Sequence, residues 1–121
     1  MSAYLSVRGW LDFVAEQRDA VRAILQRHDD GFYSRGWTEV NGPNGDSCLV
    51  YCGTIRESGA EWLLEQLQEL AAVPAPAGDP EDVVRGLLFV HHEVSGMQEW
   101  QVRDGRVKAE PLPGRYDYLQ E

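Results

Sequence analysis

The chain has 121 residues, and its 20 Asp and Glu against 11 Lys and Arg give a formal net charge of -9. This length predicts one domain, residues 1–121, and the 43% hydrophobic content is typical of a globular protein rather than a disordered acidic tail. The acidic balance argues against nucleic-acid binding, which needs Lys and Arg to contact phosphates, and it leaves a basic protein partner open.

The chain begins with a strand pattern and continues with a helix pattern. Leu5 and Val7 alternate with polar residues, which predicts a strand over 3–11. Apolar residues then return at helical spacing, so we expect a helix that starts with Asp12 as its N-cap. Gly31 ends this helix, because glycine readily takes the left-handed conformation found at helix C-termini.

A hairpin and a second helix are expected next. The run at 41–46 is dense in turn residues and separates a weaker strand, 34–40, from a strong strand pattern at 48–55. Ser58 and Glu61 have the spacing of a capping box, which predicts the start of the second helix. Its predicted buried residues are Leu63, Leu67, Leu70 and Ala71, flanked by Trp62 and Leu64, while Glu65, Gln66, Gln68 and Glu69 are predicted to face water.

The rest of the chain is predicted to contain a loop and three strands. Three prolines make 73–80 a stiff internal loop. The strand at 84–94 is apolar at successive positions, which indicates burial on both faces and a central place in the sheet. The strand at 99–103 pairs back onto it, and Asp104–Gly105 forms a hairpin turn that leads to a short strand, 106–108. The final residues are predicted to be irregular.

The predicted order of elements is β-α-β-β-α-β-β-β. This order favours an α+β fold, in which a mainly antiparallel sheet of about six strands has both helices packed on it. No stretch approaches the roughly 20 apolar residues of a membrane span. Residues 1–8 lack the basic region and apolar run of a secretion signal, so we expect a cytoplasmic protein.

The cysteines and histidines are not predicted to bind metal. Cys48 and Cys52 lie four residues apart on a strand, roughly 13 Å, which is too far for a disulfide or a shared ion. We expect both to be small core residues. His91 and His92 point to opposite faces of a strand, so one ion would not take both. His28 is explained as a cation near the negative end of a helix.

Motifs for catalysis or cofactor binding are missing from the sequence. It has no phosphate-binding loop, no Gly-x-Ser-x-Gly elbow and no His-x-Glu with a later cysteine pair. We therefore expect no cofactor, no metal, no catalytic residue and no enzymatic activity. The alternative is a small enzyme whose hairpin residues His91, His92, Glu93 and Asp104 supply a general base and an orienting carboxylate.

Aromatic and acidic residues coincide at predicted strand ends and in the tail. Aromatic anchors ringed by carboxylates are suited to a basic partner, because ring burial gives affinity and the acids give charge complementarity. The alternative is that the tryptophans cap the core. The aromatics are Trp10, Trp37, Trp100, Tyr116 and Tyr118, and the nearby acids are Glu39, Glu93, Glu99, Asp104 and Asp117.

Several short motifs together resemble a known family. They are Gly9–Trp10, the Asn44–Gly45 turn, Gly53, the strand 86–93, and Trp100–Val102 before Asp104–Gly105. This pattern resembles the immunity proteins of bacterial polymorphic toxin systems, and it is closest to the family catalogued as immunity protein seven. The resemblance implies an α+β fold and a non-enzymatic protein that binds and neutralises a cognate toxin, often a nuclease, inside the producing cell.

The expected partner is therefore a toxin with a basic surface, and the expected contact surface lies on the last three strands and the tail. The predicted contact residues are Glu93, Trp100, Asp104, Tyr116, Asp117 and Tyr118, with Trp37 and Glu39 of the first hairpin as a second choice. A third hypothesis is an adaptor domain that self-associates through Trp37 or Trp100. The sequence does not identify the oligomeric state.

Overall fold

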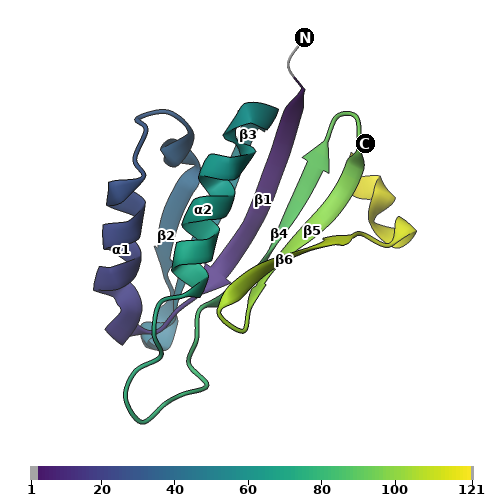
Figure 1. The fold of residues 1–121 in the computed structure, drawn as a ribbon. Helices are drawn as coiled ribbons and strands as arrows, with labels where there is room; N and C mark the ends of the chain where they lie inside the picture. The colour runs from purple at the N-terminus through teal and green to yellow at the C-terminus, as the bar shows by residue number, and fades with distance from the viewer. Residues whose placement is uncertain (1–2, 121) are drawn as a thin grey trace.

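The computed structural model describes residues 3–120, and its elements follow the predicted order (Figure 1). The strands are β1 (Tyr4–Asp12), β2 (Trp37–Asn41), β3 (Ser47–Arg56), β4 (Arg85–His92), β5 (Gly96–Arg103) and β6 (Arg106–Pro111), and the helices are α1 (Arg18–Arg27) and α2 (Ala60–Ala71). The proline-rich residues 73–80 lie in the loop between α2 and β4. A 3-10 helix, Gly114–Gln120, follows β6, and we call it the C-terminal segment.

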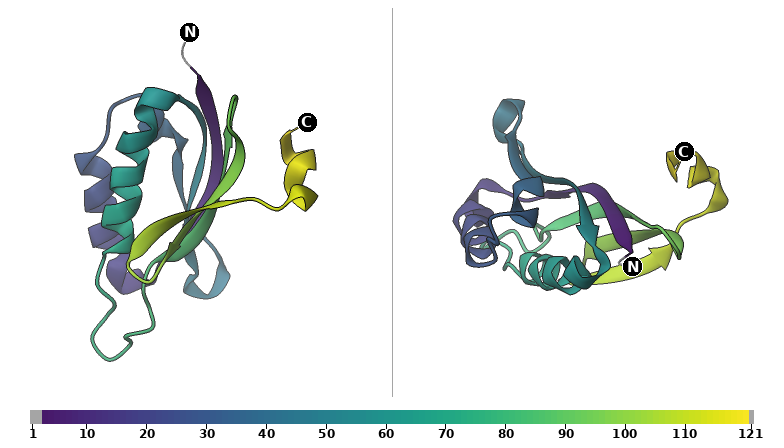
Figure 2. Two further views of the ribbon diagram at one scale, coloured as in Figure 1. Left: turned by 45° about the vertical axis from the view of Figure 1, so that its right-hand side comes forward. Right: turned by 90° about the horizontal axis from the view of Figure 1, so that it is seen from above.

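The six strands form one antiparallel sheet in the order β2-β3-β1-β4-β5-β6. Both α-helices pack on the same side of this sheet (Figures 1 and 2). We call this side the helix face, to which Leu5, Val7 and Leu11 of β1 belong. The opposite side carries Arg8 and Trp10, is covered by neither α-helix, and is called the open face. The predicted α+β fold is confirmed.

The hydrophobic core fills the space between the helix face and the two helices. Alternate residues of the strands are buried there because successive strand side chains point to opposite faces. The predicted stripe of α2, Leu63, Leu67, Leu70 and Ala71, is confirmed as buried. The strands contribute Leu5, Val7, Leu11, Leu49, Tyr51, Ile55, Leu88, Val90, Trp100 and Val102.

The expectation that Gln66 faces water is wrong. This α2 side chain is fully buried, and its Oε1 accepts a hydrogen bond from the indole nitrogen of Trp37 at 3.2 Å. Its Nε2 donates to the backbone oxygen of Trp62 at 3.3 Å. A polar side chain is needed at this position because the Trp37 indole brings a hydrogen-bond donor under the helix.

Both predicted helix starts are also wrong. Asp12 does not cap α1, because it is the last residue of β1 and pairs with Cys48 and Arg85. A 3-10 turn, Ala15–Gln17, precedes α1 instead. The capping box of α2 does not form, because residue 58 lies in a 3-10 turn and the helix starts at Ala60 without a side-chain cap. Neither helix is long and apolar enough to cross a membrane, among the residues that the structure describes.

Candidate partner-binding surface

The open face exposes apolar side chains on four neighbouring strands, from the edge strand β2 to β4. Trp10 of β1 is 41% exposed, although it lies directly between Val50 of β3 and Leu87 of β4. Val40 of β2 is 43% exposed on the same face. We call Val40, Val50, Trp10 and Leu87 the apolar row. Because solvent-facing apolar groups that form a contiguous patch mark interaction sites, the apolar row is a candidate binding surface.

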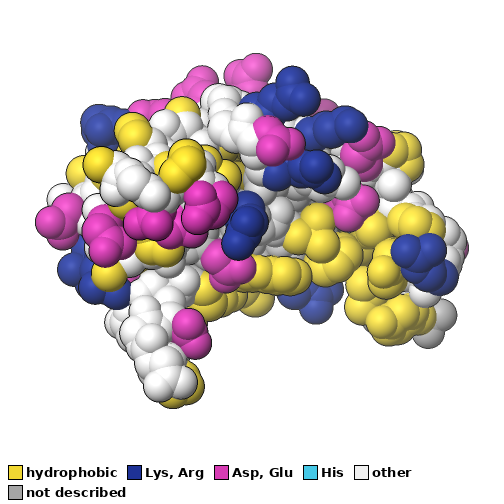
Figure 3. Space-filling model, turned by 90° about the horizontal axis from the view of Figure 1, so that it is seen from below, with side chains coloured by type: hydrophobic (Ala, Val, Ile, Leu, Met, Phe, Trp, Pro, Cys, Tyr) yellow, Lys and Arg dark blue, Asp and Glu magenta, His cyan; other side chains and the backbone are white. Residues whose placement is uncertain are grey.

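This face is hollowed between two projecting segments. Figure 3 shows hydrophobic side chains in a depression, with the turn of the β2–β3 hairpin on one side and the C-terminal segment on the other. A hollow of about 580 Å³ has Trp10 and Leu87 in its lining, together with Gln101, Arg85 and Arg103. We call it the central hollow. Its volume is in the range of pockets that hold ligands or partner side chains.

The C-terminal segment folds over one end of the open face. The rings of Tyr116 and Phe89 lie with their centroids 6.1 Å apart, and the guanidinium of Arg115 lies 4.8 Å from the Tyr116 ring centre. A second cavity of about 150 Å³, lined by Phe89, Met97 and Leu119 among others, lies beneath this segment. Tyr116 is therefore half-buried against the sheet, whereas Tyr118 and Asp117 remain exposed.

Two predicted aromatic anchors do not belong to this surface. Trp100 is only 3% exposed, because β5 turns its side chain to the helix face, where it joins the core. Trp37 is half-buried on the helix face, packs edge-to-face on Tyr51 and donates its N–H to Gln66. Trp100 is therefore a core residue and Trp37 packs against the core, in line with the alternative that tryptophans cap the core.

The predicted carboxylates are dispersed, and two of them already form ion pairs with arginines. Glu39 accepts two hydrogen bonds from Arg22, at 2.9 and 2.8 Å, and this contact lowers the pKa of the Glu39 carboxyl. Glu93, after β4, accepts a hydrogen bond from the backbone of Tyr4 at 3.1 Å. Asp104 forms an ion pair with Arg103 at 3.1 Å. These three acids do not form one acidic surface.

The alternative catalytic group does not come together. Glu93 lies in the β4–β5 turn and Asp104 in the β5–β6 turn, and the strand between these turns spans roughly 25 Å. His91 faces the open side, whereas His92 lies on the helix face with its Nε2 3.0 Å from Glu57. The two histidines point to opposite faces, as predicted. The hairpin thus cannot align His91, His92, Glu93 and Asp104 around one substrate.

The expectation that both cysteines are core residues is wrong. Cys48 is half-buried and Cys52 is exposed, because both lie on the open face, and both are free thiols. Within residues 3–120, no three His, Cys, Asp or Glu side chains come together in a group that could hold a metal ion. The open face therefore provides a hollow, exposed apolar side chains and charged groups.

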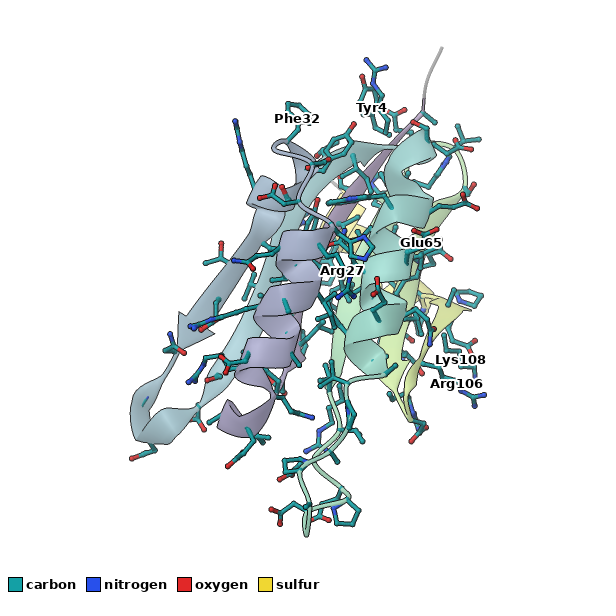
Figure 4. All side chains as sticks on the ribbon, turned by 60° about the vertical axis from the view of Figure 1, so that its left-hand side comes forward. Tyr4, Arg27, Phe32, Glu65, Arg106 and Lys108 are labelled. Carbon is teal, nitrogen blue, oxygen red and sulfur yellow. The ribbon has the colours of Figure 1, made fainter. Side chains whose placement is uncertain are left out.

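Charge is divided between the two sides of the molecule. The helices and their connections carry most of the acids, which are Glu16, Asp19, Asp29, Asp30, Glu57, Glu61, Glu65 and Glu69, with Asp79, Glu81 and Asp82 in the proline-rich loop. The open face carries six basic side chains, Arg8, Arg56, Arg85, Arg103, Arg106 and Lys108, and its strands carry fewer acids, which are Asp12, Glu99 and Glu110. Figure 4 shows Arg106 and Lys108 on β6, directed away from the helices.

Sequence reasoning named Trp10 among the aromatic residues but did not include the apolar row in the predicted contact surface. The sequence did carry a signal for Trp10, because successive strand side chains point to opposite faces. In β1, Trp10 is next to the core residue Leu11, so in a sheet with helices on one side Trp10 must lie on the uncovered side.

A scan against protein-family models and a search of curated proteins found no match to this chain.

Proposed function

We propose that this protein is a small acidic immunity protein that binds and neutralises a cognate bacterial toxin. The observation that carries the proposal is the apolar row, which exposes a tryptophan on a central strand between two projecting segments. Large aromatic groups of this kind, seated in a hollow, are the usual anchors of protein interfaces. The resemblance to immunity proteins supplies the class of partner and favours a nuclease toxin.

The charge distribution supports the same function. The net charge of -9 would accelerate association with a toxin that has a basic substrate groove. The exposed residues Asp117 and Tyr118 lie on the C-terminal segment at the edge of the open face, so they fit the predicted contact surface. Trp100 does not, because it is in the core.

Coexpression tests the proposed function. The chain is expressed together with the product of its neighbouring gene, and both growth rescue and binding in a pull-down are measured. We expect rescue and binding together. Absence of both with every neighbouring product would contradict a toxin-neutralising role.

A pair of variants tests the surface. Trp10→Ser should abolish rescue while leaving the protein folded, because the side chain is exposed and the core is untouched. The matched control is Phe32→Ser, since Phe32 is 66% exposed in the α1–β2 connection (Figure 4) and should retain full rescue. Loss of rescue in the control alone would move the contact surface to the helix side.

A further inference from the structure

The arginines on the two sides of the sheet differ in whether they form ion pairs with carboxylates. On the helix side, Arg22 forms a two-point contact with Glu39, Arg18 lies 3.6 Å from the same carboxylate, and Arg27 pairs with Glu69. On the open face, four arginines have no carboxylate within 4.0 Å among the described residues. These are Arg8, Arg56, Arg85 and Arg106.

Arginines without a carboxylate within ion-pair distance are unexpected in a chain with 20 acids and 11 bases. Arg85 lines the central hollow beside Trp10 and Leu87, and Arg8 lines the smaller cavity beside Phe89. Each of these two cavities on the open face thus has a guanidinium group in its lining. Three acids also line the central hollow: Asp104 is paired with Arg103, whereas Glu99 and Asp12, the cross-strand partner of Arg85, form no ion pair within 4.0 Å among the described residues.

We propose that the open face binds a protein segment in which aliphatic or aromatic side chains are flanked by carboxylates. The apolar side chains of the segment would cover the apolar row, and its carboxylates would pair with Arg85 and Arg8, since guanidinium binds carboxylate through two parallel hydrogen bonds. The inference rests on the proposed function and deepens it: at this face the toxin contributes acids, although the helix side attracts its basic groups.

The other possible occupants fit less well. A nucleic acid carries a charge at every phosphate, so a chain with net charge -9 would repel it more strongly than a segment with a few carboxylates. A second copy that binds through its own open face would present the same arginines rather than a segment rich in carboxylates. A segment with a few carboxylates and apolar side chains satisfies both features of the face.

A peptide titration tests this inference without the toxin. The probes are a synthetic peptide that alternates Glu with Leu and Phe, and the same peptide with Lys at every Glu. Binding to the full chain is followed by NMR through the indole N–H signals, with Trp10 assigned from Trp10→Ser. We expect saturable shifts at Trp10 with the acidic peptide and at least about tenfold weaker binding of the Lys peptide, a difference of 1.4 kcal/mol.

Matched variants give the test its specificity. Arg85→Glu should weaken binding of the acidic peptide severalfold, whereas Arg35→Glu, the same charge change in the exposed turn before β2, should leave it within twofold. Equal binding of the Lys peptide, or no binding of either peptide, would overturn the inference. Preferential binding of a single-stranded oligonucleotide, or a Trp10-dependent dimer in sedimentation, would also overturn it.

The two proposals fail separately. Peptide binding without growth rescue would remove the toxin-neutralising role and leave an acidic-segment site on the open face. Rescue without peptide binding would keep the immunity role and remove the carboxylate-bearing segment.

Discussion

Gln66 shows how one polar residue ties the edge strand β2 to α2. Its side chain is fully buried and bridges the Trp37 indole and the backbone of Trp62. Gln66→Ala would remove the acceptor of the indole N–H of the half-buried Trp37 and would open a cavity. We expect a loss of about 1–3 kcal/mol in the free energy of unfolding, measured by urea titration. The control Gln26→Ala, on the exposed side of α1, should change stability by less than about 0.5 kcal/mol.

The contact between Glu39 and Arg22 should make the free energy of unfolding depend on pH. The hydrogen bonds from Arg22 lower the pKa of Glu39 in the folded state, so its contribution is present above the unfolded pKa of about 4.5 and is lost as the pH falls through the folded pKa. Glu39→Gln should cost up to about 1 kcal/mol at pH 7, because Arg22 is half exposed, and less at pH 3. Urea unfolding at both pH values measures the difference. Glu61→Gln, on the exposed side of α2, is the control, and an equal effect there would contradict the assignment.

Strands β1 and β4 approach each other unusually closely, and glycine makes this possible. A Cβ at residue 86 would lie 1.9 Å from the backbone oxygen of Trp10, and one at Gly9 would lie 2.2 Å from that of Leu87. Gly86→Ala should therefore destabilise the protein by about 1–3 kcal/mol or more. It should also shift the NMR signals of Trp10, which borders the same contact. Gly114→Ala, whose nearest contact would be 3.6 Å away, should have neither effect.

At the level of secondary elements, the sequence predicted what depends on local pattern. The order of strands and helices and the buried stripe of α2 follow from periodicity, so they were predictable. The helix starts were not, because the β1 pairing keeps Asp12 in the sheet and the Gln17 side chain accepts the Val14 N–H and donates to the backbone of Pro74 and Asp82. Such long-range contacts have no local signal.

The candidate surface was predicted less well, because it depends on which side of the sheet the helices cover. The sequence pattern indicated that the strand containing Leu87 and Phe89 is buried on both faces. Both side chains are only half-buried, because no second layer of α-helices covers the open face. Because the sequence did not show which side of the sheet the helices cover, Cys48 was predicted to lie in the core and Trp100 on the surface. Once the covered side is known, strand parity assigns every one of these residues.

The division of charge between the two sides predicts two kinetic effects on toxin binding. Acids on the exposed side of α2 act at a distance, so Glu61→Lys with Glu65→Lys should slow association severalfold, flatten its salt dependence and leave dissociation unchanged. Arg85 lines the central hollow, so Arg85→Glu should mainly speed dissociation. Stopped-flow measurements at low and high salt, with the toxin identified by growth rescue, separate the two rates. If the α2 variant accelerates dissociation instead, the toxin contacts the helix side directly, and the open face is not the main interface.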